Sequence, residues 1–305
     1  MYTNPALKKL GFAKDDRVAI IHADDIGMCH ATLQAIEDLI DFGLVSSCSV
    51  MVPCPWFPQT ASFCRQHPEV DTGVHLTLTS EWGGYHWGPV STTNINSGLI
   101  DEQGYFHSRR HIVQANAEPE VVQRELQVQV DGALDEGIDV THIDSHMLSV
   151  YHPDYLDGYI EVAEDHDVPP LILRLEPVIW RTLKFEHELA DFLTRFMRSS
   201  QLSGLPYMDN FVMLPLDQSE ERVDLVKKNF LSLPKGCLTL YIIHPAIDTP
   251  ELRAIAPDWQ SRVADYLAFT STELRNYIRA SGVQVIGYRE LRDLLRADKK
   301  SEEKL

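Results

Sequence analysis

The chain has 305 residues, of which 44% are hydrophobic, which is enough for one large domain with a substantial core. Its 45 acidic and 27 basic side chains give a formal net charge of −18. This charge excludes non-specific binding to nucleic acid or to an anionic membrane surface. The five cysteines include no CxxC pair, which argues against a disulfide framework and a cysteine-based zinc site. Because no stretch resembles a signal peptide or a transmembrane span, we expect a cytoplasmic protein.

The first predicted strand, residues 18–21, leads into two adjacent carboxylates, Asp24 and Asp25. Gly27 permits a turn before a helix predicted over residues 29–42. Two carboxylates at the end of a buried strand are costly unless they have partners, and they commonly bind a metal or transfer protons. The alternative is a helix N-cap acid beside a solvated neighbour.

The rest of the chain alternates strand and helix patterns. Strands are predicted at 45–52, 71–78, 140–144, 171–175, 210–214, 238–243 and 283–286, and helices at 57–67, 118–136, 155–166, 185–198, 220–231, 259–269, 272–280 and 289–296. This alternation predicts an α/β fold, a TIM-like (β/α) barrel with seven or eight mainly parallel strands in a single domain, residues 1–297. A doubly wound open sheet is the alternative. The first strand is not followed by GxGxxG, which weakens a dinucleotide-binding interpretation.

Two segments depart from this rhythm. Residues 80–116 form a long irregular insertion that is rich in glycine and aromatic residues. Such loops are usually functional or disordered, and the aromatic content argues against disorder. We interpret the insertion as a lid or substrate platform on which Trp82 and Trp87 contact the substrate; an ordinary packed excursion is the alternative. Residues 298–305 are predicted to be a charged, disordered tail.

Polar side chains recur where the predicted strands end. In a barrel, the carboxyl ends of all strands open on one face, so these groups should converge. Two histidines and one carboxylate form a common open site for a divalent metal, and Asp25, His75 and His146 are the natural set. Asp24 is the candidate general base, and His244 is the candidate proton donor to a leaving group. For any single histidine, the alternative is a hydrogen-bonded core residue.

Three further histidines compete for these roles: His22, His142 and His152. His142 is four residues from His146, and the two would share a face if this stretch were helical. We favour His146, because in a strand it projects past the strand end while His142 lies lower in the barrel. Asp144 and His22 are the next candidates to activate a water molecule if Asp24 does not.

The motifs HADDIG, GVHLTLT, THIDSH and IIHPA resemble the YdjC-like family in order and spacing, from residue 18 to residue 245. That family includes chitooligosaccharide deacetylases and hopanoid-associated deacetylases. The resemblance implies an irregular (β/α) barrel and a metal-dependent carbohydrate deacetylase. By this resemblance, Asp25, His75 and His146 are the metal ligands. Asp24 is the base, and His244 is the acid. Arg174 is a weak match for an arginine that helps to hold the site.

The expected reaction is therefore removal of an N-acetyl group from an amino sugar or short oligosaccharide. The resemblance departs in two places. Chitooligosaccharide members carry a histidine-rich run after DSH, where this chain has Met147 and Leu148, and the aromatic stretch from Trp82 to Phe106 matches no known specificity. The expected cofactor is one divalent ion, with Zn²⁺ or Mg²⁺ favoured and Mn²⁺, Co²⁺ or Ni²⁺ also compatible. The expected partner is a small carbohydrate, and a homo-oligomer is possible. The alternatives are an amidohydrolase acting on a non-sugar amide or ester, and a catalytically silent carbohydrate-binding barrel.

Overall fold

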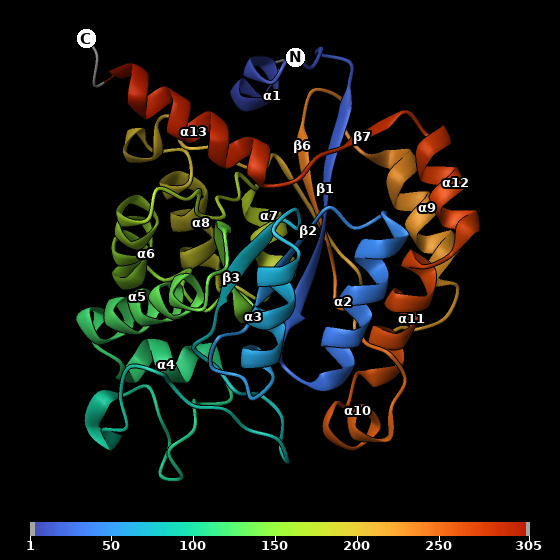
Figure 1. The fold of residues 1–305 in the computed structure, drawn as a ribbon. Coiled ribbons are helices and arrows are strands. Elements are labelled where there is room, and N and C mark those ends of the chain that lie inside the picture. Colours follow the sequence, from blue (N-terminus) through green and yellow to red (C-terminus); the bar gives the residue numbers. More distant parts are fainter. Residues whose placement is uncertain (1–3, 303–305) are drawn as a thin grey trace.

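A mainly parallel sheet forms the centre of the computed structural model, which describes residues 4–302 (Figure 1). Within these residues the sheet has seven strands, in the order β4-β3-β2-β1-β6-β5, and β7 also pairs with β1. The strands are β1 (Arg17–Ile26), β2 (Ser47–Val50), β3 (Thr72–Leu76), β4 (Val140–Ser145), β5 (Asn210–Met213), β6 (Leu238–Ile243) and β7 (Val283–Val285). The predicted α/β fold with mainly parallel strands is confirmed.

The predicted strand at 171–175 is not a regular strand. Ile143 in β4 forms an isolated parallel bridge with Pro170, and Leu173 forms another with Met208, just before β5. The segment therefore connects the two edges of the sheet by single bridges instead of a continuous ladder. The Leu171 N–H donates to the Ile143 carbonyl and the Arg174 N–H donates to the Met208 carbonyl, so the segment changes its pairing partner within a few residues.

Helices surround the sheet, and most lie close to their predicted positions. They are α1 (Pro5–Lys9), α2 (His30–Phe42), α3 (Phe57–Gln66), α4 (Arg110–Asn116), α5 (Pro119–Asp135), α6 (Pro153–Asp165), α7 (Pro177–Thr182), α8 (His187–Phe196), α9 (Arg222–Ser232), α10 (Pro250–Ile255), α11 (Trp259–Phe269), α12 (Thr272–Ala280) and α13 (Arg289–Glu302). Sequence analysis missed α1, α4, α7 and α10, because five to seven residues are too few to show a helical repeat.

The prediction of a disordered tail from residue 298 is wrong for residues 298–302. Helix α13 continues to Glu302. Its charged side chains find partners, since Asp298 pairs with Lys9 at 2.7 Å and Lys299 pairs with Asp167 at 2.5 Å. The remaining part of the predicted tail, 303–305, lies outside the described residues.

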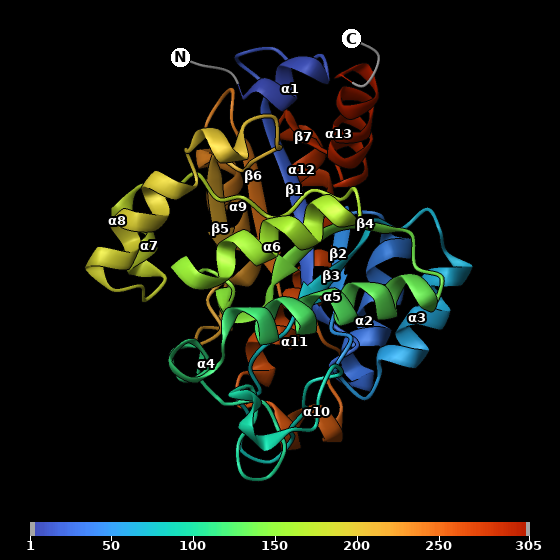
Figure 2. The same ribbon diagram turned by 90° about the vertical axis from the view of Figure 1, so that its left-hand side faces the viewer.

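The carboxyl ends of the strands point away from the two chain ends, as two perpendicular views show (Figures 1 and 2). Helices α4 and α10 lie at this end of the sheet, together with the long connection between β3 and α4. The polar residues that follow the strands therefore gather under one group of loops. Among residues 4–302, the structure contains no helix with the length and apolar character needed to cross a membrane.

Candidate metal centre

Strand β1 delivers both aspartates to one place through a local break in its geometry. Asp25 has a φ of 64°, in the left-handed region that Asp tolerates better than most residues. The pairing of β1 with β2 shifts register between Ala23 and Ile26. Both carboxylates then approach one ring nitrogen, His75 Nε2, which lies 3.8 Å from Asp24 Oδ2 and 3.4 Å from Asp25 Oδ1. The chain thus bends already at Asp25, and the turn predicted at Gly27 follows, with a φ of 87° at Gly27 and a hydrogen bond of 3.2 Å from the Met28 N–H to the Asp25 carbonyl.

Asp25, His75 and His146 converge as the sequence predicted, although they come from β1, β3 and the short turn after β4. Asp25 Oδ1 lies 3.4 Å from His75 Nε2 and 3.1 Å from His146 Nδ1. All three ligand atoms lie within 4.8 Å of one another. Nitrogen and oxygen atoms held about 2.1 Å from one tetrahedral ion are separated by about 3.4 Å. The arrangement therefore fits a divalent ion; ligation itself stays a prediction.

Each of the two histidines has a carboxylate on its far side. His75 Nδ1 lies 2.7 Å from Asp144 Oδ1, and His146 Nε2 lies 3.0 Å from Glu81 Oε2. When these nitrogens donate to the carboxylates, the other nitrogen of each ring presents its lone pair toward Asp25. Histidine ligands of metals are characteristically oriented in this way. Sequence analysis missed Glu81; its signal was its place just beyond the end of β3.

A buried arginine balances the charge of Asp25. Arg262 Nη1 in α11 donates a hydrogen bond to Asp25 Oδ2 at 2.8 Å. Burial alone would raise the pKa of Asp25, but Arg262, His146 and His75 outweigh it and hold the pKa well below its usual range. Sequence analysis missed Arg262. The available signal was that Arg262 and Asp265 share the buried face of α11 with Phe269, where unpaired charges are costly.

The weak assignment of Arg174 to the site is wrong. Its guanidinium stacks on Tyr207 at 3.6 Å from the ring centroid, and Arg174 Nε donates to the Met197 carbonyl. It lines a cavity with residues of α1 and α13, including Asn4 and Asp298. These helices lie near the chain ends, opposite the carboxyl ends of the strands (Figure 1). The arginine beside the predicted ligands is Arg262, from a helix far along the chain.

His244 directly follows β6 and faces Asp24, where the register pairs Ala23 with Ile243. His244 Nε2 lies 3.7 Å from Asp24 Oδ2. The His244 backbone N–H donates to Asp265 Oδ2 at 2.9 Å, which anchors the start of this loop to α11. Burial lowers the pKa of His244, so its imidazole is neutral near pH 7. The two residues predicted to transfer protons are therefore brought together.

The two tryptophans of the insertion are not exposed stacking surfaces. Trp82 is 4% exposed and Trp87 is 2% exposed. Trp87 Nε1 donates to the Thr79 carbonyl at 2.8 Å, and its ring lies edge-on to His146 with the centroids 6.3 Å apart. The Arg262 guanidinium lies 5.3 Å from the Trp82 ring centroid. These rings pack against the groups around Asp25. This part of the insertion is therefore a packed wall and not the exposed substrate platform that we expected.

This burial changes what we expect from substitutions in the insertion. Trp87→Ala should lower deacetylation of a sugar and hydrolysis of a small activated acetanilide to similar extents, by about tenfold or more, because it loosens His146 instead of removing a sugar contact. Steady-state kinetics on both substrates measures the ratio of the two losses. A loss confined to the sugar would instead make Trp87 a substrate contact.

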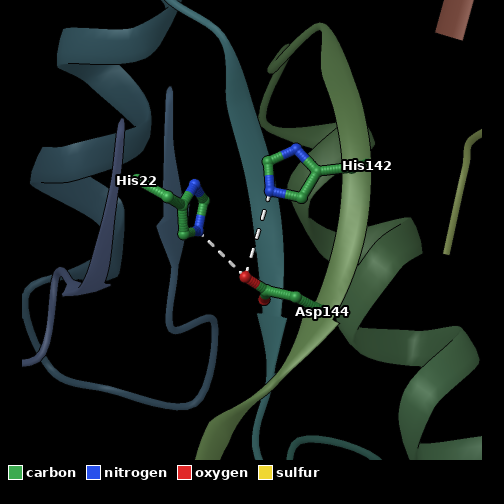
Figure 3. Close-up of side chains that lie close together, drawn as sticks. All are labelled: His22, His142 and Asp144. Atoms are coloured by element: carbon green, nitrogen blue, oxygen red, sulfur yellow. Dashed lines mark hydrogen bonds and ion pairs between the residues drawn. The ribbon is translucent and has the colours of Figure 1, made fainter. Parts of the chain in front are cut away.

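The other histidines have separate places. His152 precedes α6 and its side chain accepts from the Asp154 N–H at 3.4 Å. His22, His142 and Asp144 form a cluster behind His75 (Figure 3). His142 lies deeper in the sheet, as predicted, and stacks on Tyr288 with ring centroids 3.7 Å apart.

The His142 ring also packs against Gly73. A Cβ at this glycine would lie 2.6 Å from His142 Nδ1, with His142 Cε1 and Nε2 nearer still. We expect Gly73→Ala to lower the free energy of unfolding by about 1–3 kcal/mol through overpacking. Gly132→Ala, within α5, is the control. A Cβ at Gly132 would lie 3.4 Å from the Val52 side chain, which is an ordinary van der Waals contact. This substitution should be neutral or stabilise by up to about 1 kcal/mol. Urea denaturation measures both; equal effects would contradict this packing.

Metal binding should compete with protons. Burial alone would lower the pKa of His146, but the carboxylates of Glu81 and Asp25 outweigh burial and raise it to about 9. Below pH 9 the metal-free ring therefore carries a proton that an ion must displace. The carboxylates of Asp144, Asp24 and Asp25 likewise outweigh burial and hold the pKa of His75 well above its usual range, so an ion displaces a proton from each ring. We expect Zn²⁺ to bind about a hundredfold more tightly for each unit of pH between 6 and 8, and the dependence to weaken above pH 9. Chelator competition measures this; a dissociation constant independent of pH would contradict it.

The chain is similar in sequence to proteins of one known family. The sequence profile of the YdjC-like protein family matches residues 18–280. A Thermus thermophilus protein named carbohydrate deacetylase is 33% identical over 272 residues, which cover 89% of this chain and 93% of that protein. A Thermoanaerobacter pseudethanolicus protein of the same name is 23% identical over 269 residues, covering 88% of this chain and 97% of the relative.

A solved structure gives the same picture of the fold. A crystal structure from Enterococcus faecalis, named for cellobiose-phosphate cleavage, superposes with a TM-score of 0.71. The match covers 90% of this chain and 99% of the other, at 23% sequence identity. At this identity the likeness concerns the fold.

Proposed function

Since the chain belongs to the YdjC-like protein family, we propose that it is a metal-dependent carbohydrate deacetylase that removes an N-acetyl group from an amino sugar or a short oligosaccharide. The observation that carries this proposal is the meeting of Asp25, His75 and His146 beside Asp24 and His244. The relatives named carbohydrate deacetylase support the substrate class.

Asp25, His75 and His146 would hold the ion, which when bound would act as a Lewis acid toward the acetyl carbonyl and a water molecule. Arg262 and the Asp144 and Glu81 carboxylates would keep these side chains oriented. The donor set of one carboxylate and two imidazoles fits Zn²⁺, and the other divalent ions considered above are compatible.

Asp24 is the proposed general base. Its Oδ2 faces the site, 3.8 Å from His75 Nε2 and 3.7 Å from His244 Nε2. Asp24 takes a proton from the water molecule as the water oxygen bonds to the acetyl carbonyl carbon. The C–N bond then breaks, which gives acetate and the amino sugar.

His244 is the proposed donor to the leaving amine. Because burial lowers its pKa, a neutral His244 can give up only a proton that it has first received. Asp24, which holds the proton taken from water, is the nearest acid to His244 Nε2. In this scheme one proton passes from water through Asp24 and His244 to the amine nitrogen.

A product screen tests the proposal. Metal-loaded protein is incubated with N-acetylglucosamine, N,N′-diacetylchitobiose and longer acetylated oligosaccharides, and with p-nitroacetanilide as a non-sugar amide. Equimolar release of acetate and free amine from a sugar is the expected result. Hydrolysis of the anilide alone would favour the amidohydrolase alternative, and sugar binding without any release would favour the silent barrel.

A further inference from the structure

A second polar cluster lies behind His75, away from the position of the proposed ion. It consists of His22 on β1 and His142 and Asp144 on β4, and the two rings flank the Asp144 carboxylate (Figure 3). Asp144 Oδ1 lies 2.7 Å from His75 Nδ1, so one carboxylate oxygen is committed to that ring. Asp144 Oδ2 faces away from His75 and lies 3.0 Å from His22 Nε2. His75 is therefore connected through Asp144 to His22.

The same nitrogen of His22 also reaches the proposed base. His22 Nε2 lies 3.1 Å from Asp24 Oδ1. Among residues 4–302 that oxygen has no well-directed hydrogen bond, and its close polar contact is the one with His22 Nε2. Asp24 Oδ2 is left to face the site. The His22 ring is itself fixed, because its Nδ1 lies 3.0 Å from Ser47 Oγ and the side chain is fully buried.

We propose that His22 is a positioning residue, which ties the base Asp24 to the Asp144–His75 pair and thereby fixes the base relative to the metal centre. This inference rests on the proposed function. It follows from one donor atom lying between two carboxylates, one beside the reacting water and one behind a metal ligand. Displacing a base by about 1 Å can cost about 10²-fold in rate, so such a tie has a measurable effect.

His142 belongs to the same cluster but does not make this connection. Its Nδ1 lies 2.9 Å from Thr141 Oγ1, and its Nε2, which has no hydrogen-bond partner in the described chain, lies 3.9 Å from Asp144 Oδ2. Its ring stacks on Tyr288. His142 therefore packs beside the tie between Asp24 and Asp144, and a substitution there serves as the control.

Two variants of His22 separate positioning from packing. In His22→Gln the amide nitrogen can occupy the place of Nε2, and its two hydrogens can point to Asp24 and Asp144. In His22→Asn the amide is too short to reach either carboxylate. We expect His22→Asn to lower kcat about 10²-fold with KM changed less than about threefold, and His22→Gln to stay within about tenfold of wild type. Measuring the melting temperature of each variant tests whether it folds.

Zn²⁺ affinity provides a readout that does not depend on activity. Because Asp144 orients His75, we expect His22→Asn to weaken Zn²⁺ binding about 10-fold to 100-fold and His22→Gln to weaken it much less. The control His142→Phe keeps the stacked ring and should leave kcat and Zn²⁺ affinity within about threefold of wild type.

Three results would overturn the inference. Equal losses in His22→Asn and His22→Gln would mean that the ring acts through packing alone. A loss of kcat in His142→Phe as large as that in His22→Asn would mean that the whole cluster acts through packing alone. Two Zn²⁺ ions per wild-type chain and one per His22→Asn chain would make His22, His142 and Asp144 a second cation site. If the wild-type protein deacetylates no sugar, the proposed function fails, while the Zn²⁺ affinities still test the role of His22.

Discussion

Asp24→Asn should retain the metal and the fold and lower turnover by about 10²–10⁴-fold, the usual loss when a general base is removed. The amide keeps an oxygen that can face His22, but it cannot accept a proton from water. Because Asp24 is not among the three predicted ligands, metal content should stay at the wild-type level. The measurement is kcat, with metal content determined on the same samples.

A matched control tests whether the loss comes from the missing base or from the change in net charge. Asp131→Asn removes one carboxylate at a half-exposed site that pairs with His166, and it should leave kcat unchanged. Turnover near the wild-type value in fully loaded Asp24→Asn would show that Asp24 is not the base. Asp144 and His22 would then be the next residues to examine.

Unlike Asp24→Asn, Asp25→Asn should lower metal affinity, and its loss of activity should follow from the loss of the metal. The substitution removes the charge of a predicted ligand and weakens the partner of the buried Arg262 guanidinium, which keeps Asp258 at 2.9 Å. Removing one member of a buried ion pair typically costs about 3–5 kcal/mol, and we expect the lower end here. Zn²⁺ affinity should fall about 10²-fold or more, and activity should partly return with excess metal.

Calorimetric titration of Zn²⁺ and urea denaturation measure these two effects. Asp24→Asn is the natural comparison, because it alters the neighbouring carboxylate in the same strand. If Asp25→Asn binds Zn²⁺ as tightly as Asp24→Asn does, the predicted ligand set is wrong. If its activity does not respond to added metal, loss of the ion is not the cause of its inactivity.

The parts of the site that follow a strand could be predicted from sequence. Parallel strands bring their carboxyl ends together, so Asp25, His75 and His146 could be placed near one another without coordinates. The same argument placed His244 opposite Asp24. For Asp25 and His244 the local signal was a short apolar run that ended at a polar residue. His75 was placed late within its predicted strand, and His146 just beyond the end of its strand.

The groups that support the site could not be found in this way. Arg262 lies in the middle of a helix, and its role depends on how α11 packs against β1, which no local pattern encodes. Glu81 lay within an insertion that had no periodicity. The insertion's aromatic residues suggested an exposed platform, but hydrophobic rings on a folded loop gain more by burial, and Trp82 and Trp87 are buried.

Backbone detail was also beyond the sequence patterns. Alternation along a strand predicts that Asp24 and Asp25 point in opposite directions. The left-handed conformation of Asp25 removes that alternation, and the Asp25 carboxylate then contacts Arg262, His75 and His146. The predicted strand at 171–175 likewise failed, because the segment changes from pairing with Ile143 to pairing with Met208 within a few residues.

The most direct test of the central claim is a metal titration of the metal-free protein, followed by acetate release from an acetylated oligosaccharide. The protein is stripped with a chelator, reconstituted with increasing Zn²⁺, and assayed at each ion-to-chain ratio. We predict negligible activity without metal and a linear rise to a plateau at one ion per chain. Full activity in the stripped protein, or acetate release that does not follow the bound ion, would contradict a deacetylase built on Asp25, His75 and His146.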